Sequence, residues 1–497
     1  MSGPSLKRQA LSGVRWMVSA RLLVQLVTWP STIIIMRLLN PRDYGLVAVA
    51  TVFTEFVTVF SDPGLAAGLV QTHVLSDETS RAASALIAVL NLVLVGVLLL
   101  AAPSIAAWYH EPELAQIIPV ASLSLLMTAI ATVPQAQLVR NMRFREIALA
   151  MIAGSVAASL TTILCAILGL GVWSLVAGSL VLSGLRSTVI IGYNRSAVWP
   201  DYSRGFEPVR HLMHFSLHML GNRILYYWSG NLDLMILGRL VHSTELGSYS
   251  VGANLAAIPG DKAMEAVNRV SFPTLSRLRQ QRAQFNYTYE RILRMLALYG
   301  FLVAWGLAAV APEFVHVVLS DKWHLAVIPL VLLSIAAPFR MLTVFQNIVN
   351  SAAGVPQAST RVLGLTCLLL SVAILIGARV SGINGAAVSC LVVYAIVFLV
   401  STLYTCRVTD RTMRDNLRLI LVPLIAGLSM LIVTWAVRAL LFVHLPIPVL
   451  LCVEIVAAAG AFIGTVQALG PAVLSDARAL LSELLRPEKA ADTGIAS

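Results

Sequence analysis

The sequence predicts an all-α polytopic membrane protein, and three observations support that prediction. Hydrophobic residues make up 58% of the 497-residue chain, charged residues only 12%, and the mean hydropathy is +0.83, which is too apolar for a soluble domain of this length. Apolar stretches of about 18 residues or more recur along the chain, and each can cross a hydrocarbon core of about 30 Å as a helix. Two short segments with the same residue pattern, Arg37–Gly45 and Arg239–Gly247, each link two such stretches.

Hydropathy and turn residues divide the chain into about 14 predicted spans. They cover 14–36, 46–69, 82–106, 115–138, 146–168, 172–192, 214–238, 246–269, 293–318, 325–349, 360–380, 383–405, 417–440 and 447–469. The eighth span is the weakest, because Pro259-Gly260-Asp261-Lys262 is expected to interrupt it. The outer connections are expected to hold about ten residues or fewer, which leaves no room there for a catalytic domain.

The predicted spans group into two lobes of six helices and a C-terminal extension of two. A segment typical of a connecting loop, rich in Pro, Gly, Ser and Arg, separates the sixth span from the seventh. We expect an N-terminal lobe over 1–192, a cytoplasmic connecting loop over 193–213, a C-terminal lobe over 214–405, two extra spans within 406–469 and a cytoplasmic tail over 470–497.

The repeated segments follow the first span of each lobe, as expected of a transporter built from two similar halves. The alternative is that any short turn between helices favours Arg, Asp and Gly.

Arg and Lys are distributed unevenly between the two sides of the predicted membrane segment. The connections on the side of the N-terminus hold most of them, including Arg143, Arg282 and Arg411, whereas the opposite connections hold few, such as Arg42 and Lys322. The positive-inside rule therefore places both termini in the cytoplasm. The net charge of +11 reflects this topology and contact with anionic lipid, and we expect no nucleic-acid partner.

The sequence contains no motif of a known enzyme mechanism. We find no Gly-rich phosphate loop, no His-Glu-x-x-His and no Gly-x-Ser-x-Gly. The five cysteines show no metal-ligand spacing. His214 and His218 share a helical face, so a weak metal site stays open beside the interpretation that they are ordinary interfacial residues. We expect no enzymatic activity, no catalytic residue, no cofactor and no resident metal.

The most informative residues are the ionisable side chains inside predicted spans, because a buried charge in a membrane is costly and usually marks a pathway or a pair. The candidates among them are Arg21, Glu55, Asp62, Arg223, Asp233 and Arg340. Arg223 and Arg340 each lie well inside a span with no acid in register within one turn, so we expect them to line a cavity. Arg21 is a third cavity candidate, and the three acids are candidates for a gate or for ion coupling.

Arg21 and Glu55 lie at similar predicted depths. Arg21 is roughly 10 Å from the cytoplasmic end of the first span and Glu55 roughly 14 Å from the outer end of the second. The two side chains are therefore expected to pair across neighbouring helices, while Glu55 and Asp62 share one helical face. The alternative for Arg21 is that it extends to the membrane interface.

Four segments resemble a known family. Arg37–Leu46 and Asp62–Gln71 are similar to the opening of bacterial polysaccharide-repeat flippases in the multidrug/oligosaccharidyl-lipid/polysaccharide exporter superfamily. Arg140–Phe144 resembles the basic turn after the fourth span of that family, and Asn231–Tyr249 resembles its region between the seventh and eighth spans. The resemblance covers residues 1–410, and within the family it extends to exporters of xanthan repeat units.

The resemblance implies a 14-helix, two-lobe, MATE-like flippase of the bacterial inner membrane. Such a protein moves oligosaccharides linked to undecaprenyl diphosphate from the cytoplasmic to the periplasmic leaflet for exopolysaccharide biosynthesis. Its implied partners are the lipid-linked oligosaccharide, membrane lipids and the polysaccharide polymerase or export machinery. The residues agree with this implication, because a diphosphate needs cations in a low-dielectric site and Arg binds its oxygens through a planar fork.

Two other functions stay open. A drug or cation antiporter of the same superfamily is expected to line its cavity mainly with acids, whereas here the three acids face three arginines. That balance favours an anionic substrate. A scaffold without transport activity in a polysaccharide assembly complex fits the basic cytoplasmic connections but leaves the arginines inside the spans unexplained.

Overall fold

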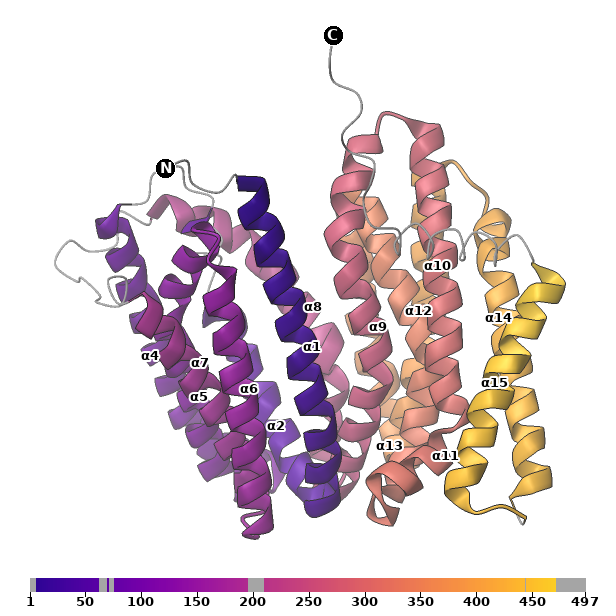
Figure 1. Cartoon of the computed structure of the whole chain (residues 1–497), viewed down its shortest axis with the longest axis horizontal. Helices are drawn as coiled ribbons and strands as arrows, with labels where there is room; N and C mark the ends of the chain where they lie inside the picture. Colours follow the sequence, from indigo (N-terminus) through magenta and orange to yellow (C-terminus); the bar gives the residue numbers. More distant parts are fainter. Residues whose placement is uncertain (1–5, 62–68, 71–75, 195–209, 443, 471–497) are drawn as a thin grey trace. The chain divides into compact units, whose positions relative to one another are not determined.

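The computed structural model describes residues 6–61, 69–70, 76–194, 210–442 and 444–470. Within these ranges the chain consists of helices and short connections and contains no strand, which confirms the all-α prediction (Figure 1). The chain divides into two compact units. Unit 1 comprises Met1–Ser250, Val318–Trp323 and Ala378–Ile383, and unit 2 comprises Val251–Val317, His324–Gly377 and Asn384–Ser497.

Among its described residues, unit 1 contains seven whole helices and the beginning of an eighth. They are α1 (Leu6–Leu38), α2 (Pro41–Ser61), α4 (Asp77–Tyr109), α5 (Leu114–Arg140), α6 (Phe144–Ile167), α7 (Val172–Tyr193), α8 (Arg210–Leu240) and the first turns of α9 (Ser243–Leu278). Helix α6 packs against α1 and α7, and α5 packs against α4, α7 and α2. Small side chains such as Ala83 of α4 and Ala129 of α5 are buried where these helices meet, which allows close approach in a membrane where apolar burial alone does not drive association.

Unit 2 is built around α10 (Arg282–Ala309). Its other elements are the rest of α9, α11 (Ala311–Phe314), a π-helical turn (Val315–Leu319) shared with unit 1, a 3-10 turn (Asp321–Ala326) likewise shared, α12 (Val327–Ala352), α13 (Pro356–Thr409), α14 (Met413–Leu441) and α15 (Ile447–Leu469). Helix α10 contacts α12, α14 and α15. Its buried aromatic residues Tyr289, Phe301 and Trp305 form the centre of a hydrophobic core with Phe345 of α12.

Helix α13 is a hairpin of two helices. Ser381 and Gly382 have non-helical backbone angles, and Gly382 has a φ of 56° that favours glycine. The Ser389 hydroxyl donates to the carbonyl of Ala373 at 2.7 Å, on the other side of this bend. Because residues before and after the bend contact each other, the two halves run antiparallel, and α13 accounts for the predicted eleventh and twelfth spans.

The helices agree with the predicted number of spans. Eleven described helices are long and apolar enough to cross a membrane, and α13 has the length for two crossings. Helices α8 and α9 are also of spanning length but are more polar. The predicted interruption of α9 is wrong, because the helix continues through Pro259 to Leu278. Pro259 has no backbone N–H, so the helix lacks one of its hydrogen bonds there. A contact from α10 supports the same turn, since the Tyr299 hydroxyl donates to the Pro259 carbonyl at 3.1 Å.

The connection between the predicted ninth and tenth spans is longer than expected. Helix α10 ends at Ala309, and α11, the π-helical turn and the 3-10 turn occupy the connection to α12. Hydropathy extended the ninth span to residue 318 because this connection contains apolar residues, of which Ala311, Val315 and Leu319 are buried. An apolar stretch indicates that its residues are buried, but it does not show what buries them. In this connection the apolar residues pack against other parts of the protein and do not belong to one continuous membrane helix.

Candidate functional site

The two repeated segments contact each other within unit 1. Gly45 lies in the first turn of α2, and Gly247 lies in the first turn of α9. A Cβ atom at Gly45 would overlap the carbonyl oxygen of Ser243, and one at Gly247 would overlap the carbonyl oxygen of Pro41. The contact is therefore reciprocal, with each glycine against the backbone of the other repeat. Two equivalent segments related by an approximate two-fold axis produce this kind of contact.

A third segment, Val318–Trp323, is hydrogen-bonded to the end of α1. The Arg37 Nε donates to the carbonyl of Val318 at 2.9 Å, and the Lys322 Nζ donates to the carbonyl of Arg37 at 2.6 Å. The indole N–H of Trp323 donates to the carbonyl of Met36 at 2.9 Å. The bonds from Lys322 and Trp323 satisfy carbonyl groups that the end of α1 would otherwise leave unpaired. We call residues 36–45, 239–247 and 318–323 together the clasp.

The other residues of the first repeat also have defined contacts. The Asp43 carboxylate accepts from the backbone N–H of Asn40 at 2.9 Å and so caps the start of α2. Tyr44 meets the fully buried ring of Trp323 edge-on, with 5.2 Å between the ring centroids. Arg42 forms an ion pair with Glu113 of the α4–α5 connection at 2.8 Å. The sequence pattern therefore encodes a turn, a cap and a contact surface.

Glu55 lies midway along α2, where that helix packs against α8. Its side chain is exposed. Nearby, Tyr227 of α8 donates its hydroxyl to the carbonyl of Val52, and its ring lies 5.7 Å from that of Phe56. Helix α2 packs against α4, α5, α7 and α8, whereas α1, which contains Arg21, packs along α6. The pairing of Arg21 with Glu55 stays a prediction.

Asp233 connects α8 to the beginning of α9. Its carboxylate accepts hydrogen bonds from the Tyr249 hydroxyl at 2.8 Å and from the backbone N–H of Leu234 at 2.9 Å. Tyr249 is fully buried and follows Gly247 of the clasp by two residues. Asp233 therefore accepts a hydrogen bond that links α8 to α9 next to the clasp. The sequence did not indicate this structural role.

The three cavity candidates lie in different units. Arg21 is partly buried on α1 and Arg223 is exposed on α8, both in unit 1. Arg340 is partly buried on α12 in unit 2, and its guanidinium lies 6.0 Å from the ring centroid of Tyr394. This is a cation–π contact between α12 and the second half of α13. Asp62 lies outside the described residues.

Sequence analysis missed a buried ionic cluster in unit 2. Arg438 of α14 forms ion pairs with Glu313 of α11 and, at 3.2 Å, with Glu454 of α15. It also donates to the carbonyl of Ala309 at 2.8 Å. Glu454 is fully buried and Glu313 is 4% exposed. A signal was present, since Glu454 is the single acid of the last predicted span. Its partners Arg438 and Glu313 lie in the predicted thirteenth and ninth spans.

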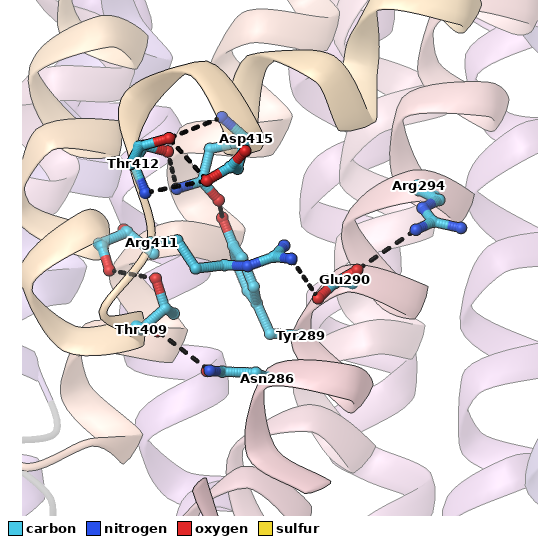
Figure 2. A network of polar contacts seen from close by, with 10 residues as sticks. Asn286, Tyr289, Glu290, Arg294, Thr409, Arg411, Thr412 and Asp415 are labelled. Carbon is cyan, nitrogen blue, oxygen red and sulfur yellow. Dashed lines mark hydrogen bonds and ion pairs between the residues drawn. The ribbon is translucent and has the colours of Figure 1, made fainter. Parts of the chain in front are cut away.

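A polar network fixes the opposite end of α10 (Figure 2). Arg411 reaches from the α13–α14 turn to Glu290 of α10 at 2.7 Å, and Glu290 also pairs with Arg294 at 3.2 Å (Figure 2). The Tyr289 hydroxyl donates to the side-chain carbonyl of Asn416 at 2.9 Å. The α13–α14 turn is thereby held against α10.

The described residues include no group of three or more His, Cys, Asp and Glu side chains arranged to hold a metal ion. The side chains of His214 and His218, which left a weak metal site open, are not among those that the structure describes.

Comparison with known proteins identifies the family. Residues 34–328, more than half of the chain, match the family described as "Polysaccharide biosynthesis protein". The chain belongs to this family. It is similar to "Succinoglycan biosynthesis transport protein ExoT" of Rhizobium meliloti (strain 1021), with 28% identity over 295 residues that cover 59% of each protein.

Two solved structures show the same fold. The lipid II flippase MurJ in an inward closed conformation has a TM-score of 0.66 and 14% identity, covering 94% of this chain and 100% of MurJ. An inward-facing multidrug resistance MATE family transporter of the MOP superfamily has a TM-score of 0.58 and 16% identity, covering 79% of this chain and 96% of the transporter. The predicted family and fold are confirmed. The chain is a multi-pass membrane protein of this polysaccharide biosynthesis family.

Proposed function

We propose that the protein moves oligosaccharide repeat units linked to undecaprenyl diphosphate from the cytoplasmic to the periplasmic leaflet of the bacterial inner membrane. The observation that carries this proposal is the reciprocal contact of the two repeats at Gly45 and Gly247. Contact between equivalent segments of two similar halves is suited to alternating access, in which one half moves against the other. The family match, the MurJ-like fold and the name of ExoT as a transport protein support it.

We propose that the clasp is the outer gate. The positive-inside rule places its turns on the periplasmic side. At the crossing, backbone meets backbone without an intervening side chain, so the two helix ends separate without having to break an ion pair there. The surrounding bonds of Arg37, Lys322 and Trp323 go to carbonyl groups, and water at the membrane surface replaces such bonds at small net cost.

We propose that Arg21, Arg223 and Arg340 receive the diphosphate, while Glu55, Asp62 and Asp233 serve the gate or its coupling. Arg340 carries the clearest support, since a cation–π contact with Tyr394 leaves its guanidinium N–H groups able to donate to a phosphate. Replacing Arg340 with Ala should abolish export at normal protein levels. Lys should restore only part of it, because Lys lacks the planar fork.

The direct test is deletion of the gene in its host, followed by leaflet-resolved analysis of lipid-linked oligosaccharides. We expect a complete repeat unit to accumulate on undecaprenyl diphosphate in the cytoplasmic leaflet, and a unit of the xanthan type is the first candidate to assay. Expression of the wild-type chain should restore polymer. Normal export in the deletion strain would refute the proposal, and drug sensitivity without oligosaccharide accumulation would indicate an antiporter.

A further inference from the structure

Unit 2 contains a basic pocket that none of the steps above uses. Its volume is about 580 Å³, and it lies where the end of α9, the beginning of α10, the α12–α13 turn and the end of α13 come together. Four arginines line it, namely Arg279, Arg282, Arg361 and Arg407. The remaining lining residues are apolar or uncharged, so no carboxylate belongs to the lining. The pocket is a concentration of positive charge that needs an anionic ligand.

The arginines are held by contacts that keep their charge. The Arg279 guanidinium lies against Gly354, where a Cβ would overlap it, and Gly354 has a φ of 85° that favours glycine. Arg407 lies 5.8 Å from the ring centroid of Tyr404. Arg282 donates to the carbonyl of Val408. These contacts orient the guanidinium groups without neutralising them.

One carboxylate lies close to the pocket. Asp410 pairs with Arg282 at 3.1 Å, and both side chains are more than half exposed. Such an exposed pair is weak and offsets one of the four positive charges. The remaining three arginines, Arg279, Arg361 and Arg407, are the ones expected to meet a ligand.

The start of a long helix adds a second, independent source of positive potential. Helix α13 begins at Pro356, and Gln357 and Ala358 of its first turn line the pocket. The N-terminus of a helix carries a partial positive charge that attracts phosphate. Here the charge contributes more than the donors do, because Pro356 has no N–H and the Ala358 N–H donates to the Val355 carbonyl at 3.1 Å. Arginine forks and a helix N-terminus thus converge on one cavity.

The remaining lining indicates the kind of molecule that carries the phosphate. Phe285, Val355 and Val408 give the pocket an apolar wall beside the arginines. A soluble phosphate does not need such a wall, whereas the headgroup of a lipid brings apolar atoms with it. The positive-inside rule places these arginine-rich segments at the cytoplasmic membrane surface, where anionic lipid headgroups lie.

We propose that this pocket binds the phosphate headgroup of a membrane lipid. The chemistry is shared by two sources, the phosphodiester of bulk anionic phospholipid and the diphosphate of a polyprenyl carrier. The inference does not rest on the proposed function, because binding is measured on the purified full-length protein with each lipid alone.

Native mass spectrometry of the full chain in detergent provides the test. The probes are phosphatidylglycerol, undecaprenyl diphosphate and, as a neutral reference, phosphatidylcholine. The pocket variant combines Arg361→Gln with Arg407→Gln, and the control combines Arg414→Gln with Arg418→Gln. All four side chains are exposed, and the control pair lies outside the pocket lining, so both variants lose the same charge at low risk to folding.

We expect the pocket variant to bind the preferred anionic lipid about tenfold more weakly or worse, with little change in the control. Preference of the wild type for phosphatidylglycerol supports a bulk-lipid site, and preference for undecaprenyl diphosphate supports a site for the carrier headgroup. Equal binding of both anionic lipids by the pocket and control variants would overturn the inference, as would wild-type binding of phosphatidylcholine as tight as that of either anionic lipid.

Discussion

The clasp of unit 1 and the ionic cluster of unit 2 both connect helices, but they do so with opposite chemistry. The clasp joins backbone to backbone at Gly45 and Gly247 and uses Arg37, Lys322 and Trp323 as donors to carbonyl groups. When the clasp opens, water replaces its lost hydrogen bonds, and the net cost per bond is small.

The cluster of Arg438, Glu313 and Glu454 behaves differently. Both carboxylates are buried, and Arg438 is the cation that the structure pairs with each of them. Pulling these groups apart would leave unpaired charges in a low-dielectric site, which is strongly unfavourable. The comparison indicates which contacts break during transport. We expect the contacts of the clasp to break and re-form in each cycle. We expect the ion pairs of the cluster to persist and to hold α14 and α15 against the end of α10.

The largest effect is expected in the cluster. Arg438→Ala leaves Glu313 and Glu454 unpaired, so we expect a loss of about 3–5 kcal/mol of stability. Thermal unfolding in detergent and the amount of protein in the membrane would measure it. The matched control adds Glu313→Gln and Glu454→Gln to Arg438→Ala, and it should recover part of the loss. If the Arg438→Ala variant unfolds at the same temperature as the wild type, the cluster does not stabilise the packing of α14 and α15.

A smaller effect on stability, with a larger one on export, is expected in the clasp. Gly247→Ala places a Cβ against the carbonyl of Pro41, and such overpacking costs about 1–3 kcal/mol. Alanine favours helix more than glycine, so a loss cannot come from helix propensity. Export should fall while the protein level stays near normal. Gly96→Ala is the control, since a Cβ at Gly96 has no neighbour within 4 Å. Export by Gly247→Ala equal to that of the control would remove the crossing from the mechanism.

The smallest effect is expected beside the clasp, at Asp233. Asn keeps a carbonyl oxygen that accepts from Tyr249, so Asp233→Asn should export nearly as well as the wild type. Asp233→Ala removes the acceptor and should lower the stability by about 1–3 kcal/mol. Export assays with thermal unfolding separate the two variants. A stable Asp233→Asn protein without export would instead assign the carboxylate a role in ion coupling.

Much of the fold follows from the sequence because lipid forces backbone groups to bond internally, so long apolar stretches must be helices. The repeats were also readable, since Arg, an acid and Gly recur at equal spacing. The reason for each glycine was not readable, because it depends on Ser243 and Pro41 of the opposite repeat.

Side-chain partners were harder to predict than helices. The proposed pair of Arg21 and Glu55 used depth in the membrane, but depth fixes height and not which helices are neighbours. The cluster around Glu454 was missed for a related reason: Arg438 and Glu313 come from distant segments that only tertiary packing brings together. The basic pocket likewise combines three separate segments of unit 2.

The most direct test asks whether the clasp opens during transport. Ser243 is 9% exposed at the crossing, whereas Thr244 beside it is exposed. In a variant whose five native cysteines are replaced, Ser243→Cys and Thr244→Cys would be labelled with an impermeant thiol reagent in spheroplasts. We expect Ser243→Cys to react faster in cells that make the lipid-linked repeat unit than in cells that cannot, and Thr244→Cys to react equally in both. Equal, slow labelling of Ser243→Cys in both kinds of cell, with normal labelling of Thr244→Cys, would contradict the assignment of the clasp as the outer gate.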